Sequence, residues 1–200
     1  MGFKKSLFLL IFVICITLLF SFWIKERNRV KFPFPAKIVC FGNSLTSGVG
    51  AEKGKDYPSQ LALLLKTEVI NSGIPGDTTS SALQRIEKDV LRFHPDLVIV
   101  LLGGNDFLKK YPLKETEKNI REIVERIKEE DAQIILVSPL PFYDSLYKQI
   151  AREMGILFIP HILSGILTDP ELKSDEVHPN EKGYFLMAKR IERFIKRHIE

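Results

Sequence analysis

The stretch Lys37-Ile38-Val39-Cys40-Phe41-Gly42-Asn43-Ser44-Leu45-Thr46-Ser47-Gly48 joins a short apolar run to a polar segment that contains glycine. The run predicts a buried strand that ends where a serine begins. In an open parallel sheet, ligands bind outside the carboxyl ends of the strands, where a hydroxyl that directly follows the first strand would lie. Ser44 is therefore a candidate nucleophile, although serine is also common at turns and helix N-caps.

A second polar loop, near the C-terminus, contains Asp175 and His178 and precedes a final amphipathic segment. A serine hydroxyl is a poor nucleophile until a base removes its proton. The base in turn needs a partner that fixes its tautomer and stabilises the imidazolium. Ser44, His178 and Asp175 supply these three roles, and the neighbouring Glu176 is a rival for the acid.

Short β-branched runs alternate with longer stretches of helical period from Lys37 onward. The expected strands are 38–41, 68–71, 97–102, 134–138 and 156–159. The expected helices are 57–66, 79–93, 113–130, 143–154 and 180–199. This alternation predicts an α/β fold in which helices cover both faces of a parallel sheet.

Residues 6–24 form an almost unbroken apolar run with basic residues on both sides. A bilayer-spanning helix needs about 20 such residues, so we expect a membrane-spanning helix. The alternative is a cleaved signal peptide, but the run is longer than the roughly 7 to 15 residues typical of one, and no small-residue cleavage site follows. We expect an anchor or signal segment at 1–24, a linker at 25–36 and one globular domain at 37–200.

The charge distribution gives no sign of a nucleic-acid partner. Residues 1–30 carry five basic residues and one acidic residue, which accounts for the whole net charge of +4. The remaining chain is formally neutral, so its charge offers no support for a phosphate-tracking surface. Cys15, Cys40, His94 and His161 have no partners at metal-ligand spacing, and we expect no metal and no cofactor.

Two further loops follow predicted strands. Pro75-Gly76 is typical of a type II turn, and Asp77 or Thr78 could cap the next helix. Gly103-Gly104-Asn105-Asp106 follows the third strand, and a structural turn would also explain it. The functional interpretation is that the N–H of Gly76 and the side-chain amide of Asn105 point into the crevice of Ser44, toward developing negative charge.

Four blocks of this sequence resemble those of the SGNH (GDSL-type) hydrolases, in the same order: Gly42-Asn43-Ser44-Leu45, Gly76-Asp77, Gly103-Gly104-Asn105-Asp106 and Asp175-x-x-His178-Pro179. The chain is most similar to the bacterial thioesterase I / lysophospholipase L1 group. The resemblance implies a flavodoxin-like three-layer α/β/α fold with about five parallel strands, here preceded by the N-terminal membrane-spanning helix. It also implies Ser44 as nucleophile, His178 as general base and Asp175 as orienting acid. The implied oxyanion hole comprises Ser44, Gly76 and Asn105.

This sequence departs from the Gly-Asp-Ser-Leu motif of the family, because Asn43 replaces the aspartate. That aspartate is not the acid of the triad, so the assignment of Ser44 is unaffected. The departure leaves the local hydrogen bonding open, since an asparagine amide can donate as well as accept.

Apolar side chains cluster in the loops after the third and fourth predicted strands, namely Phe107, Leu108, Tyr111, Leu140 and Pro141. We expect them to line a groove for an acyl chain, although packing of these loops against helices would explain them equally well. The thioesterase-like relatives have a Leu-Pro pair at the place of Leu140-Pro141, which favours acyl chains.

The predicted function is that of a serine esterase that cleaves small-molecule or lipid acyl esters or thioesters through an acyl-enzyme. The family argument favours a catalytic domain outside the cytoplasm, which would be secreted if the N-terminal segment were cleaved. One alternative is a cell-surface carbohydrate O-deacetylase or acetyltransferase. Another is a membrane-tethered binding module with an anion-binding loop at residues 42–50, which lacks the known phosphate-binding motifs.

Overall fold

The computed structural model describes residues 34–199, of which 35–194 form one compact unit. The predicted membrane helix at 6–24 and nearly all of the linker lie outside the described residues. Among residues 34–199, no helix combines the length and the apolar character that crossing a bilayer requires.

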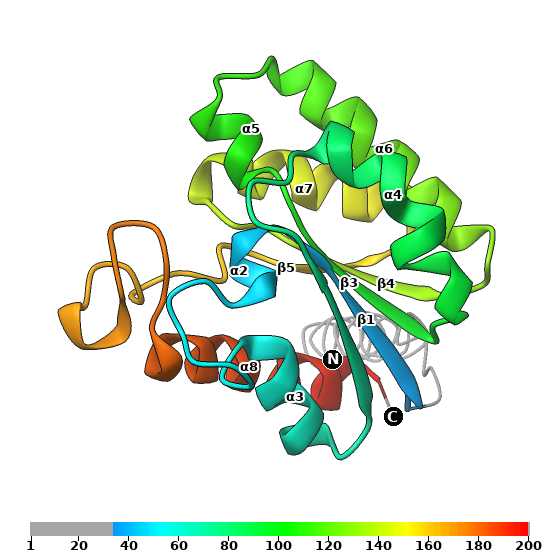
Figure 1. The fold of residues 1–200 in the computed structure, drawn as a ribbon. Coiled ribbons are helices and arrows are strands. Elements are labelled where there is room, and N and C mark those ends of the chain that lie inside the picture. Colours follow the sequence, from blue (N-terminus) through cyan, green and yellow to red (C-terminus); the bar gives the residue numbers. More distant parts are fainter. Residues whose placement is uncertain (1–33, 200) are drawn as a thin grey trace, which may run out of the picture. The chain divides into compact units, whose positions relative to one another are not determined.

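The centre of the fold is a parallel sheet with the strand order β2-β1-β3-β4-β5, which is the flavodoxin-like order (Figure 1). Its strands β1, β3 and β4 are continuous apolar runs that are almost entirely buried, as expected for a parallel sheet covered on both faces. The predicted parallel sheet is therefore confirmed. The strands are β1 (Lys37–Gly42), β2 (Glu68–Gly73), β3 (Leu97–Leu101), β4 (Gln133–Val137) and β5 (Leu157–Ile159).

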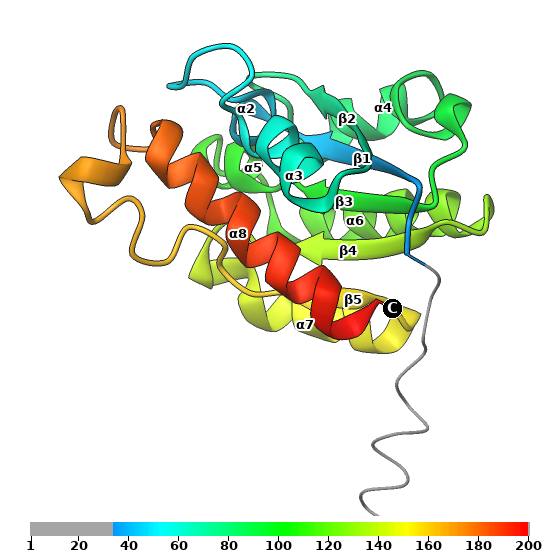
Figure 2. The same cartoon turned by 90° about the horizontal axis from the view of Figure 1, so that it is seen from below.

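Helices cover both faces of this sheet. Figures 1 and 2 show α4, α6 and α7 on one face and α3 and α8 on the other. The predicted arrangement of three layers is confirmed. These helices are α3 (Tyr57–Leu65), α4 (Thr79–Asp89), α6 (Leu113–Lys128), α7 (Pro141–Met154) and α8 (Glu181–His198).

The structure differs from the predicted elements in three places. The helix expected at 79–93 is divided, because α4 ends at Asp89 and a 3₁₀ turn, Leu91–Phe93, follows Val90, whose backbone leaves the helical region. The segments after β1 and β3 contain the short helices α2 (Ser44–Ser47) and α5 (Gly104–Leu108), where the sequence predicted loops. Helices of four or five residues are too short to show a periodic pattern.

The core on the α4, α6 and α7 side of the sheet consists mainly of β-branched and aromatic side chains. Val39 and Phe41 of β1 and Val98 and Val100 of β3 pack there against helix side chains. The helical members include the four apolar residues whose spacing predicted α6: Ile120, Ile123, Val124 and Ile127. On the other face Cys40 is fully buried, and burial raises the pKa of its thiol, so it behaves as a small apolar residue as expected.

The register of β1 brings three loops to one level at the carboxyl edge of the sheet. Gly42, the last residue of β1, pairs with Gly73 of β2 and with Leu101 of β3. The space at Gly42 is too small for a side chain, because a Cβ atom there would lie 2.1 Å from Thr46 Oγ1 and 2.6 Å from Leu101 O. Glycine thus lets the turn after β1 approach the neighbouring strand.

We expect Gly42→Ala to destabilise the fold by roughly 1 to 3 kcal/mol, because the new methyl group overpacks a site bounded partly by backbone. Gly104→Ala is the matched control, since its Cβ would meet only Asn43 Nδ2 at the ordinary distance of 3.5 Å. Urea-induced unfolding of the two variants and the parent chain measures the difference. Equal stability of Gly42→Ala and the parent would contradict this account of the turn.

Candidate active site

Ser44 lies at the carboxyl end of β1, as the first residue of α2. The buried Asn43 is the N-cap of this helix, and its Oδ1 accepts the N–H of Leu45 at 3.1 Å. Asparagine therefore fulfils with its amide oxygen a capping role that a carboxylate could also perform. Within residues 34–199, the N–H of Ser44 has no hydrogen-bond acceptor.

His178 connects Ser44 to Asp175. Its Nε2 lies 3.0 Å from Ser44 Oγ, and its Nδ1 lies 2.8 Å from Asp175 Oδ2. The other carboxylate oxygen, Oδ1, accepts the backbone N–H groups of Val177 and His178, both at 2.8 Å. A tight turn around this pair is closed by the N–H of Ser174, which donates to His178 O at 2.9 Å. The loop thus fixes the carboxylate and the imidazole relative to each other.

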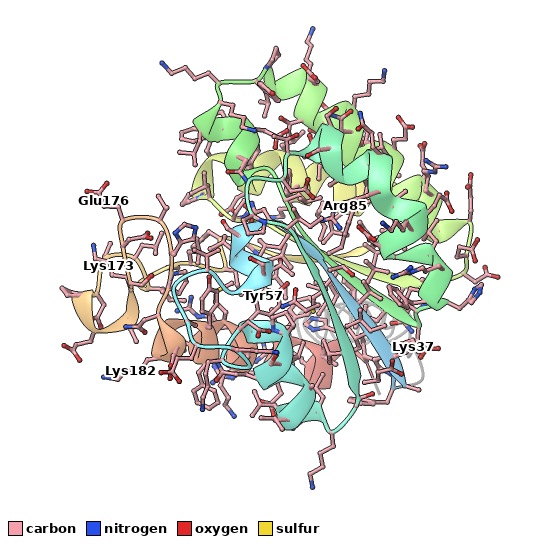
Figure 3. The ribbon with its side chains drawn as sticks, viewed as in Figure 1. Lys37, Tyr57, Arg85, Lys173, Glu176 and Lys182 are labelled. Atoms are coloured by element: carbon pink, nitrogen blue, oxygen red, sulfur yellow. The ribbon has the colours of Figure 1, made fainter. Side chains whose placement is uncertain are left out.

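The surroundings of Asp175 favour its ionised form. The N–H of Val177, followed by the His178 ring, holds the pKa of the Asp175 carboxyl below its ordinary value. The carboxylate is therefore charged at neutral pH. In this form it accepts a hydrogen bond from a protonated Nδ1 of the His178 ring. The rival acid, Glu176, points away from the ribbon in Figure 3.

The loop after β2 forms the predicted type II turn. The N–H of Asp77 donates to Ile74 O at 3.2 Å, and Gly76 has a φ of 83°, which favours glycine. Of the two predicted caps, Thr78 is the N-cap of α4. In the described part of the chain, the N–H of Gly76 has no hydrogen-bond acceptor and remains a free donor.

Asn105 connects the loop after β3 to this turn. Its Nδ2 donates to Asp77 O at 2.8 Å, which uses one of the two amide hydrogens. A second bridge joins the turn to β1, because the N–H of Ile74 donates to Gly42 O at 3.0 Å. The structure thus links the three loops that carry Ser44, Gly76 and Asn105.

The contacts of two buried carboxylates in this region were not anticipated from the sequence. Asp106 accepts the N–H of Thr79 at 3.0 Å and also its hydroxyl, which ties α5 to the start of α4. Asp77 accepts Arg85 Nε at 2.7 Å. Arg85 lies three residues after the buried Ala82 on α4, at the border of the buried face, so helical spacing could have indicated it.

Most of the apolar side chains expected to line a groove lie at the surface, whereas Leu140 is partly buried and packs against the core. Phe107 and Leu108 belong to α5 and are 45% and 61% exposed, so their expected placement in a loop was wrong. Pro141 is likewise helical, as the first residue of α7, whereas Leu140 directly precedes this helix as its N-cap, in the loop where it was expected. The ring of Phe107 lies 5.3 Å from that of Phe142, which is also exposed. The exposed Tyr111 follows α5 in sequence, so exposed aromatic side chains come from the α5 segment and from α7.

The two remaining histidines lie in different surroundings. His94 has a largely exposed side chain and ends the 3₁₀ turn after α4. His161 hydrogen-bonds Asp144 through its ring and, at 3.0 Å, through its backbone N–H. No group of three or more metal-ligating side chains occurs among residues 34–199.

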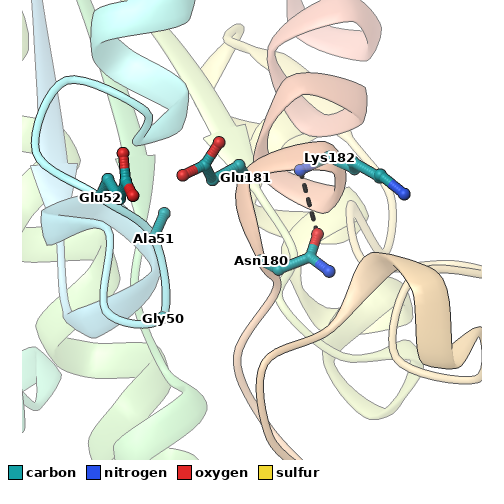
Figure 4. Close-up of a pocket in the computed structure, with 6 residues that line it drawn as sticks. All are labelled: Gly50, Ala51, Glu52, Asn180, Glu181 and Lys182. Atoms are coloured by element: carbon teal, nitrogen blue, oxygen red, sulfur yellow. Dashed lines mark hydrogen bonds between the residues drawn. The ribbon is translucent and has the colours of Figure 1, made fainter.

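A pocket of about 610 Å³ lies beside the loop that carries His178 (Figure 4). Figure 4 shows the carboxylates of Glu52 and Glu181 on its walls. Its lining residues are Gly50, Ala51, Glu52, Asn180, Glu181 and Lys182, so neither Ser44 nor His178 lines it. The pocket is therefore separate from the hydrogen-bonded serine and histidine.

The strand order and the serine hydrogen-bonded to histidine after β1 define a flavodoxin-like α/β protein with a hydrolase-type site. Residues 40–186 match the model of the GDSL-like Lipase/Acylhydrolase family. The chain belongs to this family, and the resemblance read from the sequence is confirmed. It is accordingly an ester hydrolase of the GDSL type.

Known relatives differ in the substrates that their names describe. The chain is 29% identical to an arylesterase of Vibrio mimicus, over 82% of this chain and 90% of the relative. It is 27% identical to thioesterase 1/protease 1/lysophospholipase L1 of Escherichia coli, over 76% of this chain and 79% of the relative. A solved acetyl xylan esterase from Geobacillus stearothermophilus has a TM-score of 0.68 and 26% identity, over 83% of this chain and 97% of that structure.

We expect Asp175→Asn to lower the turnover of p-nitrophenyl acetate by roughly 10²- to 10⁴-fold, because an amide no longer stabilises an imidazolium or fixes its tautomer. Glu176→Gln removes the neighbouring carboxylate and is the matched control, with turnover close to that of the parent. An equal loss in both variants, or a larger loss in Glu176→Gln, would refute the pairing of Asp175 with His178.

Proposed function

We propose that this chain hydrolyses acyl esters or thioesters through an acyl-enzyme on Ser44, with His178 as general base and Asp175 as orienting acid. The observation that carries the proposal is the chain of hydrogen bonds from Ser44 Oγ through the imidazole to the carboxylate, at 3.0 and 2.8 Å. The first distance allows direct proton transfer from Ser44 to His178, and the second allows Asp175 to orient the ring without a bridging water.

In the first step, Ser44 Oγ attacks the carbonyl carbon of the substrate while His178 Nε2 takes its proton. The resulting imidazolium is stabilised by the Asp175 carboxylate, whose pKa is lowered mainly by the N–H of Val177. When the tetrahedral intermediate collapses, the imidazolium gives the proton to the leaving alkoxide or thiolate. The acyl group then remains on Ser44 Oγ.

The negative charge on the carbonyl oxygen requires hydrogen-bond donors that are in place before the reaction. The N–H groups of Ser44 and Gly76 and the second amide hydrogen of Asn105 are the donors we assign to this role. Their loops are linked by hydrogen bonds between Ile74 and Gly42 and between Asn105 and Asp77. One such donor is worth roughly 10²- to 10³-fold in kcat.

In the second step, a water molecule attacks the acyl-enzyme while His178 Nε2 accepts its proton. Collapse of this intermediate returns the proton to Ser44 Oγ and releases a carboxylic acid. The same residues therefore serve both half-reactions, and no further group is required by the chemistry.

The proposed substrate carries an acyl chain longer than acetyl. Exposed apolar side chains from α5 and the start of α7 support this, above all the contacting rings of Phe107 and Phe142. Burial of these groups against a chain would stabilise the complex by about 25 cal/mol per Å² of apolar surface removed from water. The similarity to the Escherichia coli thioesterase and lysophospholipase supports the same class.

The second candidate is a carbohydrate O-deacetylase, which the structural similarity to an acetyl xylan esterase favours. It would use the same nucleophile but would accept only a short acyl group. The binding module considered from the sequence is set aside, because the chain belongs to a family of hydrolases.

The decisive experiment is hydrolysis of p-nitrophenyl esters from acetyl to palmitoyl by the full chain in detergent. We expect Ser44→Ala to lose at least about 10⁴-fold in kcat, since no nucleophile remains. Ser47→Ala is the matched control, because Ser47 Oγ donates to Ser44 O and is not aligned with the base. Turnover that extends to medium or long chains supports the acylhydrolase, whereas activity confined to acetyl supports the deacetylase. Unchanged turnover in Ser44→Ala would refute the mechanism.

We further propose that residues 6–24 anchor the protein in a membrane and that residues 37–200 act outside the cytoplasm. The apolar run of this segment is long enough for one bilayer-spanning helix. A catalytic domain held near a bilayer would meet lipid esters at high local concentration.

Alkaline carbonate extraction of cells that express the full chain tests the anchor. We expect the protein to remain in the membrane pellet with its N-terminal residues intact by mass spectrometry, because burial of the apolar run resists extraction. The control is Leu10→Arg/Ile14→Arg, which interrupts the run and should release the protein. A soluble product that lacks the N-terminal segment would instead indicate a cleaved signal peptide.

A further inference from the structure

Arg85 makes the densest set of polar contacts near the proposed site, although it does not touch Ser44 or His178. It lies on α4 with a side chain only 13% exposed, between this helix and the sheet (Figure 3). Its Nη2 donates to Gly42 O at 3.1 Å and to Ser72 O at 3.0 Å, at the carboxyl ends of β1 and β2. One guanidinium therefore joins two strands at the edge where their loops begin.

The same guanidinium holds the turn after β2. Arg85 Nε and Nη2 lie 2.7 and 2.6 Å from Asp77 Oδ2, and the side chain of Asp77 is only 6% exposed. Asp89 lies 3.2 Å from Nη1, and the ring of Phe41 supports the group at 4.5 Å from its centroid. Carboxylates and a π-face thus surround the charge and fix its plane.

Each assigned oxyanion donor is close in sequence, or hydrogen-bonded, to a residue that Arg85 contacts. Gly42, whose carbonyl accepts Nη2, precedes Ser44 by two residues. Asp77, whose carboxylate accepts Nε, directly follows Gly76. The backbone carbonyl of Asp77 accepts Asn105 Nδ2 at 2.8 Å. A shift of this guanidinium would therefore move all three donors relative to one another.

Arginine is suited to this task in a way that lysine is not. Its planar fork donates in several fixed directions at once, whereas an ammonium group is a compact point charge on a flexible stem. The acceptors here are two backbone carbonyls, on β1 and β2, and two carboxylates, one in the turn after β2 and one on α4. A lysine at this position could neutralise Asp77 but could not hold both strand ends in the same geometry.

We propose that Arg85 is a positioning residue for the oxyanion hole, setting the relative placement of the Ser44, Gly76 and Asn105 donors. This inference rests on the proposed function of the same site. Because the donors act on the charge that develops in the transition state, Arg85 affects kcat and leaves KM nearly unchanged. It acts through other groups and does not contact the substrate.

The test compares Arg85→Lys and Arg85→Met with the parent chain on a p-nitrophenyl ester, each at a temperature where it is fully folded. We expect kcat to fall about 10²-fold in Arg85→Lys, since a small misplacement of catalytic groups has an effect of this size, while KM changes less than about threefold. Arg85→Met, which removes the guanidinium partner of Asp77, should lose at least as much. Arg121→Lys is the matched control, because Arg121 also bridges two carboxylates, Glu117 and Glu153, but lies away from the strand ends.

Combination with Asn105→Ala separates positioning from general destabilisation. If Arg85 acts through the donors, Arg85→Lys should cost several-fold less in kcat in the Asn105→Ala background than in the parent chain, because one of the three donors that it places is already absent. Independent losses that multiply, or a kcat in Arg85→Lys equal to that of the parent, would overturn the inference. The Arg85→Lys variant retains a positive charge beside Asp77. It therefore still tests the positioning role if Arg85→Met does not fold.

Ser44→Ala, measured in the same assay, distinguishes failure of the proposed function from failure of the positioning role of Arg85. Full turnover in Ser44→Ala would refute the proposed function and the positioning role with it. Loss of turnover in Ser44→Ala together with full turnover in Arg85→Lys would refute only the role of Arg85.

Discussion

The site depends on the parallel register of β1 with its two neighbours. Gly42 pairs with Gly73 on one side and with Leu101 on the other, so β1, β2 and β3 end at the same level. Adjacent strands lie about 4.8 Å apart, which brings three separate loops within reach of one carbonyl group. Ser44, Gly76 and Asn105 follow these strand ends by two, three and four residues. A slip by one residue would turn each strand's buried side chains to the opposite face, so the packed core protects this alignment.

Buried charges then fix the loops that the register brings together. Asp77 and Asp106 are nearly inaccessible carboxylates, and each joins α4 to a loop of the site. For the ion pair of Asp77 with Arg85, removing one partner costs about 3 to 5 kcal/mol, because the other charge stays desolvated and unpaired. The same cost makes the paired arrangement rigid, because any movement that lengthens these hydrogen bonds leaves the buried groups less well paired. Rigid donors are what stabilisation of a developing oxyanion requires.

The sequence predicted those features that depend on local pattern. Buried β-branched runs predicted the sheet, and the spacing of Ile120, Ile123 and Ile127 predicted α6. The short helices α2 and α5 were missed because neither completes two turns. The contact of Arg85 with Gly42 spans 43 residues, and the contact of His178 with Ser44 spans 134. No local pattern encodes such pairs. The pairing of His178 with Ser44 was anticipated from the chemistry that a serine nucleophile requires and from the family resemblance, whereas nothing anticipated the contact of Arg85 with Gly42.

The hydrogen bonds of His178 have two different origins. Its bond to Asp175 arises within one turn, whose backbone N–H groups hold the carboxylate although that side chain is 52% exposed and open to competing water. Its bond to Ser44 instead requires two distant loops to approach closely. Gly50 makes this possible, because a Cβ atom there would lie 2.1 Å from Ser174 Oγ and 2.7 Å from Pro179 O. Orientation of the base is therefore local, whereas its distance from the nucleophile is set by backbone packing around Gly50.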